Sequence, residues 1–157
     1  QGEDIYTLST EKLAIFRRRQ IGLIYQFFNL IPTLNVDENI TLPCELDGQT
    51  VDKKRLDKLI DELGLNGRKT HLPEELSGGQ QQRVSIGRAL INRPAIVLAD
   101  EPTGNLDKKN SDEIVELLRR ANQEYRQTII MITHNLEIAK TADRVIVIED
   151  GKIIREG

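Results

Sequence analysis

The chain has 157 residues, of which 38% are apolar and 30% charged, and this size and composition fit one domain with a packed core. A net charge of −3 gives no reason to expect non-specific binding to nucleic acid. Cys44 is the only cysteine, which excludes a disulfide framework and favours a reducing compartment. No apolar run has the length of a membrane span, so we expect any membrane role to act through a partner. Because the chain begins at Gln1 and not at Met, we expect it to be part of a longer protein.

The first ninety residues are predicted to be mainly helical. Four segments carry helical caps or apolar periodicity: residues 10–19, 36–45, 52–64 and 78–92. We expect Pro43 to disturb the second of these helices and Gly64 to end the third. A short run of β-branched and aromatic residues at 21–25 predicts a strand. Since residues 27–92 otherwise carry little strand signal, we interpret them as a helical insert.

The pattern changes in the last third of the chain, where strands and helices alternate. We predict buried strands at 96–100 and 128–133, helices at 108–124 and 136–142, and a hairpin turning at Asp150-Gly151. Alternation of this kind is typical of an α/β fold with a mainly parallel sheet. We therefore assign residues 1–26 and 93–157 to an α/β core that is interrupted by the insert.

A candidate phosphate-binding site begins the helix at 78–92. Ser77 is a typical helix cap, and Gly78 and Gly79 leave backbone amides free for the close approach of an anion. A plain serine-capped helix is the structural alternative. We favour phosphate binding because the sequence gives no structural reason for Gln80 and the three residues after it, Gln81, Gln82 and Arg83.

Polar residues also follow the predicted strands. Asp100 and Glu101 end one strand, His134 follows another, and Gln26 follows the first. Parallel strands bring their carboxyl ends to one edge of a sheet, where ligands bind. At that edge Asp100 could hold Mg²⁺ and Glu101 could act as a general base. Taken singly, each residue is also compatible with an ordinary structural role.

Together these runs resemble the motifs of ATP-binding-cassette (ABC) proteins. The run LSGGQQQR at 76–83 resembles their signature motif, residues 96–102 their Walker B strand, and residues 103–107 their D-loop. Gln26 resembles the Q-loop glutamine and His134 the switch histidine. The resemblance covers essentially the whole chain. Within the family, the chain is most similar to ATPases of the lipoprotein-release and macrolide-export type.

The resemblance implies a P-loop NTPase (RecA-like) fold with an inserted helical subdomain, truncated at the N-terminus. It implies ATP and Mg²⁺ as ligands, with Asp100 and Gln26 at the metal, Glu101 as general base and His134 at the γ-phosphate. The resemblance also implies a dimer with a second ATP-binding domain, most simply a second copy of the chain. Five residues of this chain would then act on the ATP bound by that second domain: Ser77, Gly78, Gly79, Gln80 and Asp107. It also implies a transmembrane permease subunit docked on residues 27–34 and the insert, a peripheral location on the cytoplasmic face, and no nucleic acid.

The family's Walker A loop, GxxxxGK[ST], is absent from these 157 residues. The nearest string, at 64–70, lacks the adjacent Gly and Lys and follows a helix where a strand is required. Two readings therefore stay open at this point. The chain could be part of an ABC transporter ATPase, or a non-enzymatic fragment or degenerate cassette that acts only by binding or self-association.

We predict that the purified 157-residue chain alone has no measurable ATPase activity. Without the phosphate cradle, the main term that binds and neutralises the triphosphate is missing. Phosphate release from ATP would be measured with and without the substitution Glu101→Gln. Turnover that disappears on this substitution would contradict the prediction.

Overall fold

The structure is a computed structural model that describes residues 4–157. The elements, with η marking a 3-10 helix, are η1 Ile5–Thr7, α1 Thr10–Gln20, β1 Ile21–Ile24, α2 Val36–Leu46, α3 Lys53–Glu62, η2 Asn66–Arg68, η3 Pro73–Glu75, α4 Gly78–Leu90, β2 Ile96–Asp100, α5 Lys108–Tyr125, β3 Thr128–Ile132, α6 Leu136–Ala139, β4 Ile146–Glu149 and β5 Lys152–Glu156. Pro43 lies inside α2 without ending it. The four helices predicted before residue 93 are therefore all present. Between α3 and α4 the chain also forms the short 3-10 helices η2 and η3. Within the described part of the chain, every helix is too short or too polar to cross a bilayer.

A three-stranded parallel sheet confirms the predicted α/β class. Its order is β1-β2-β3, and the register sets Ile24 beside Ala99 and Asp100 beside Ile132. The three strands therefore end close together at their carboxyl ends. β4 and β5 form a separate antiparallel hairpin, in which Asp150 and Gly151 both have a positive φ, as a type I′ turn requires.

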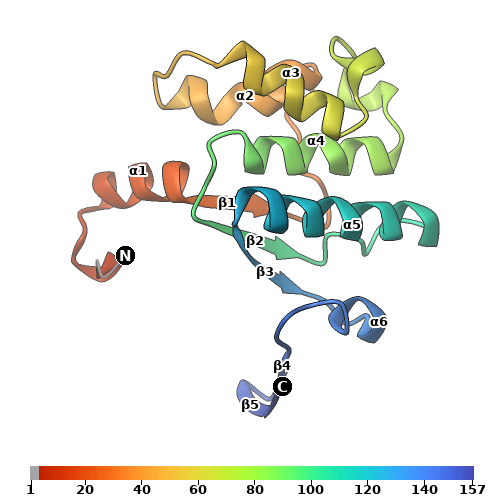
Figure 1. Ribbon diagram of the computed structural model, residues 1–157. Coiled ribbons are helices and arrows are strands. Elements are labelled where there is room, and N and C mark those ends of the chain that lie inside the picture. The colour runs from red at the N-terminus through yellow and green to blue at the C-terminus, as the bar shows by residue number, and fades with distance from the viewer. Residues whose placement is uncertain (1–3) are drawn as a thin grey trace.

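Helices cover one face of the sheet in two layers. α4 packs on β1, α5 contacts α4 and β3, and α2 packs on the far side of α4 (Figure 1). The core between these layers is aliphatic, and it includes Ile24 and Val97 from the sheet with Ile86 and Ile114 from the helices. Only helices occur between β1 and β2. The boundaries of the insert at 27 and 92 stay a prediction, because α4 contacts both α2 and the sheet.

The strand predicted at 128–133 is present as β3, but the prediction that it is buried is wrong. Among the described residues, one face of β3 is exposed. Ile129 and Met131 pack against the core, but Ile130 and Ile132 are 51% and 62% exposed. Alternate side chains of a strand point to opposite faces, so the face away from α4 and α5 carries these two exposed residues. Leu23 of β1 is exposed as well. The continuous apolar run at 128–133 predicts a strand that is covered on both faces of the sheet. The described residues cover only the face towards α4 and α5.

Tyr125, at the end of α5, connects α5 to α3. Its hydroxyl donates a hydrogen bond to Glu62 Oε2 at 2.6 Å, and the Arg55 and Lys58 cations lie 5.8 and 5.6 Å from its ring centroid. Arg55 also donates to the carbonyl of Leu90 at the end of α4. Burial, with the Glu62 carboxylate beside the phenol, raises the pKa of Tyr125 to about 12. One cluster thus holds three helices together.

We expect the free energy of unfolding to fall as the pH rises from about 10 to about 12, in part through Tyr125. The unfolded phenol loses its proton near pH 10, whereas the native pKa is about 12, so rising pH favours the unfolded state across this window. Tyr125→Phe removes the contribution. Urea denaturation of both proteins at about pH 9 and about pH 11 measures it. Equal losses of stability in the two proteins would contradict this assignment.

Candidate active site

The residues predicted at strand ends lie along one edge of the sheet. Gln26 follows β1, Asp100 is the last residue of β2 with Glu101 next to it, and His134 follows β3. The parallel register brings these positions to the same side, because the three strands run in the same direction and end together. The structure therefore brings together the four residues that the sequence placed at this edge.

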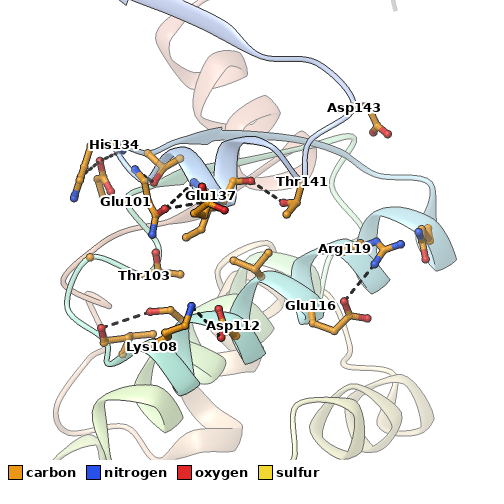
Figure 2. Close-up of a pocket in the computed structure, with 18 residues that line it drawn as sticks. Glu101, Thr103, Lys108, Asp112, Glu116, Arg119, His134, Glu137, Thr141 and Asp143 are labelled. Atoms are coloured by element: carbon orange, nitrogen blue, oxygen red, sulfur yellow. Dashed lines mark hydrogen bonds and ion pairs between the residues drawn. The ribbon is translucent and has the colours of Figure 1, made fainter. Parts of the chain in front are cut away.

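Glu101 and His134 contact each other directly. Glu101 Oε1 accepts a hydrogen bond from the His134 backbone amide at 2.9 Å and lies 2.7 Å from His134 Nδ1 (Figure 2). Since a carboxylate only accepts, Nδ1 carries the proton of this bond and Nε2 is left free. The Glu101 side chain is 19% exposed and the His134 side chain 83%. The carboxylate is therefore held in place, while the ring reaches into solvent.

The backbone at Glu101 is in the left-handed region, with a φ of 45°. A side chain in this region has a conformational cost that the surroundings must offset. The Glu101 amide donates to the carbonyl of Ile132 at 3.0 Å, and its carbonyl accepts from Gly104 at 3.0 Å. These bonds hold the turn that directs the carboxylate towards His134.

The predicted D-loop packs against Gln26. Gln26 Nε2 donates to Asn105 Oδ1 at 3.2 Å, and Asn105 Nδ2 donates to the Gln26 carbonyl at 3.0 Å. A Cβ on Gly104 would lie 2.8 Å from Gln26 Nε2, so a side chain there would displace the glutamine. Asn105 thus holds Gln26 in place, and the sequence did not single it out because its partner is 79 positions away.

The N-terminus of α4 has the geometry of an anion site. Ser77 and Gln80 form a reciprocal capping box, with the Gln80 amide 3.3 Å from Ser77 Oγ and the Ser77 amide 2.9 Å from Gln80 Oε1. Among the residues that the structure describes, the amides of Gly78 and Gly79 have no hydrogen-bond partner. The two free amides and the helix dipole leave positive potential at this end.

The start of α5 lies beside the start of α4. A Cβ on Gly79 would collide with the side chain of Asn110, so the glycine permits the close approach. Asp107 caps α5, and its two oxygens accept from the Asn110 backbone amide at 2.9 Å and side-chain amide at 2.7 Å. These bonds hold the pKa of Asp107 below its usual value, so its carboxylate stays ionised. Its role across a dimer stays a prediction.

Each of the four residues after Gly79 makes a structural contact. The expectation that nothing structural requires them was therefore wrong. Gln80 completes the capping box, and Gln81 donates to the Leu76 carbonyl at 3.2 Å. Gln82 donates to the carbonyls of Tyr25 and Pro102. Arg83 forms an ion pair with Glu113. These partners are tertiary contacts or helix-capping bonds, so residue types alone did not indicate them.

An open groove of about 800 Å³ lies between α5 and residues 133–143, which include α6 (Figure 2). Glu101 and His134 lie at one end, but Gln26, Asp100 and Ser77 do not line it. Its lining is rich in carboxylates, and its two principal cations each lie within 4 Å of one of them: Lys108–Asp112 and Arg119–Glu116. Such a surface repels phosphates. This groove is therefore a poor candidate for a phosphate site.

A divalent metal would have few protein ligands at this edge. The described residues contain no cluster of three or more His, Cys, Asp or Glu side chains that could hold a metal ion. Asp100 is exposed at the end of β2, and Gln26 offers an amide oxygen. Mg²⁺ is commonly held by one or two carboxylates with water and substrate phosphates, and this sparse set of oxygens fits that pattern.

Comparisons with known proteins agree with these motifs. The family model described as "ABC transporter" matches residues 1–104. The macrolide export ATP-binding/permease protein MacB of Brucella melitensis is 47% identical over 157 residues, which cover 99% of this chain and 24% of that protein. The lipoprotein-releasing system ATP-binding protein LolD 1 of Rhodopirellula baltica is 42% identical over 158 residues, with 99% of this chain and 69% of that protein covered.

A solved structure is similar to this chain in both fold and sequence. The dimeric ATP-binding cassette MJ0796, described as a post-hydrolysis state bound to ADP and Pi, matches with a TM-score of 0.84 and 39% identity. The match covers 96% of this chain and 68% of that one. The chain thus spans about a quarter of the macrolide-export relative and about two thirds of the cassette.

Proposed function

The chain belongs to the ABC transporter family, and on this premise we propose that the protein is the ATP-binding and ATP-hydrolysing subunit of an ABC transporter, which couples hydrolysis to movement of a substrate across or out of a membrane. The observation that carries the proposal is the bonded pair of Glu101 and His134, at the sheet edge where Gln26 and Asp100 also lie. Hydrolysis of a phosphoanhydride needs a base for water and a group at the γ-phosphate, and this pair supplies both.

Each residue has a defined part in this proposal. Glu101 accepts a proton from the attacking water, and its bonds to His134 hold it in position. With Nδ1 engaged by the carboxylate, the free Nε2 of His134 contacts a γ-phosphate oxygen, which requires that this nitrogen also carry a proton. Gln26, held by Asn105, orients water and reaches the metal.

The nucleotide and metal follow from the same arrangement. Asp100 and Gln26 would hold Mg²⁺ together with phosphate oxygens, and the ion would neutralise charge on the phosphates. Residues outside these 157 would supply the phosphate cradle, since GxxxxGK[ST] is absent from the chain. Across a homodimer, the amides of Gly78 and Gly79, with Ser77 and Gln80, would contact the ATP bound by the partner copy. The dimeric, ADP- and Pi-bound MJ0796 cassette supports this part.

The permease would dock on the segment after Gln26. Phe27 is 74% exposed and Ile31 40%, so apolar side chains project from this segment. Its backbone is held by α4, because Arg88 of that helix donates to the carbonyls of Phe28 at 2.9 Å and Asn29 at 2.6 Å. A rigid backbone with exposed apolar residues suits contact with a transmembrane subunit. The protein would then sit peripherally on the cytoplasmic face of the membrane.

We expect Glu101→Gln and His134→Ala in the complete protein each to lower kcat for ATP by about a hundredfold or more. ATP affinity should stay close to that of the wild type, since neither residue belongs to the phosphate cradle. Steady-state turnover and nucleotide binding by calorimetry separate the two quantities. Arg144→Ala, in an exposed pair with Glu156, serves as a surface control. Undiminished turnover in either active-site variant would count against the mechanism.

The docking assignment can be tested with a photo-crosslinker on a single new cysteine. Cys44, the native thiol, is buried, so Phe27→Cys presents an accessible thiol at the proposed surface. We expect a crosslinker attached there to label the permease subunit in native membranes. Tyr6→Cys, at an even more exposed aromatic position outside this surface, should not. Equal labelling from the two positions would exclude residue 27 as a docking position.

A further inference from the structure

Gln82 is a polar side chain with no exposed surface, in the second turn of α4, the helix that begins in the signature motif. Its Nε2 donates to the Pro102 carbonyl at 2.7 Å and lies 3.4 Å from the Tyr25 carbonyl, which it approaches as a second donor. Both partners are backbone oxygens, so the side-chain nitrogen must face them. Its Oε1 has no partner among the described residues. The amide is therefore fixed by its two donor bonds alone.

The two carbonyls flank the candidate catalytic residues. The Tyr25 carbonyl belongs to the peptide that joins Tyr25 to Gln26, and Pro102 follows Glu101 directly. Glu101 also has a left-handed backbone, which needs external contacts to persist. No other hydrogen bond reaches the Pro102 carbonyl from the described residues, so Gln82 is the contact that holds this side of the turn.

We propose that Gln82 is a positioning residue for ATP hydrolysis, which ties the signature helix to the backbone that follows β1 and β2 and so holds Gln26 and Glu101 in place. The inference rests on the proposed function, because it assigns a role within that reaction. Gln82 makes no hydrogen bond to either candidate catalytic side chain, so it acts through the backbone next to them. Its loss should affect the chemical step more than nucleotide affinity.

Gln127 offers a matched control at the opposite end of the same strand. It is 5% exposed, its Nε2 donates to the Pro94 carbonyl at 3.0 Å, and its Oε1 also lacks a partner among the described residues. Pro94 precedes β2, whereas Pro102 follows it. Replacing Gln82 removes two buried donor bonds and replacing Gln127 removes one, but only Gln82 lies at the catalytic end.

The experiment compares Gln82→Met with Gln127→Met in the complete protein. Methionine keeps the length of the side chain and removes the amide. We expect Gln82→Met to lower kcat for ATP about tenfold, with the dissociation constant for ATP changed by less than about twofold. Gln127→Met should lower the melting temperature by an amount comparable to the effect of Gln82→Met. Its kcat should stay within about twofold of the wild type.

The outcomes separate the inference from the proposed function. A wild-type protein that does not hydrolyse ATP overturns both. An active wild type, with equal kcat in the two methionine variants, overturns the role of Gln82 and leaves the proposed function standing. If Gln82→Met fails to fold, Gln82→Asn replaces it, because asparagine keeps the amide but is one methylene too short to reach both carbonyls. A kcat for Gln82→Asn equal to that of the wild type also overturns the inference.

Discussion

The parallel register of β1, β2 and β3 is the constraint on which the candidate site depends. It places Ile24, Ala99 and Met131 side by side, so residues from three distant parts of the chain emerge at one edge. No single segment contains the site. The bond between Glu101 and His134, 33 positions apart, exists only because the two strands end together. A slip of one residue in β3 would turn its side chains to the other face and break this pair.

α4 is the second organising element, because it contributes to three parts of the candidate site. Its N-terminus presents the free amides of Gly78 and Gly79, its second turn reaches the strand ends through Gln82, and Arg88 holds the segment after Gln26. Burial lowers the pKa of the Arg88 guanidinium, which is nonetheless satisfied by two carbonyls. Aliphatic residues such as Ile86 bury the rest of the helix against the sheet and α2. A helix fixed at so many points behaves as a rigid part.

The sequence predicted much of the fold and the positions of the strand-end residues. The helix cap Ser77 and the turn at Asp150-Gly151 are local signals that the structure confirms. The exposure of β3 could not be predicted, because an apolar run does not reveal which other segments cover it. The roles of Gln82 and Asn105 could not either, since each bonds to residues far away in sequence. Local patterns thus predicted elements and candidate residues, while tertiary contacts determine how those residues are held.

The arrangement around α4 also connects the proposed docking surface with the catalytic edge. Arg88 fixes the backbone of Phe28 and Asn29, both of which have a positive φ, and Gln82 fixes the backbone next to Glu101. Under the proposed function, a permease that shifts the segment after Gln26 would disturb a helix that also contacts the turn at Glu101. Coupling between two sites is reciprocal in free energy. A nucleotide that favours one position of α4 would therefore favour the matching position of the docking segment, with no further moving part required.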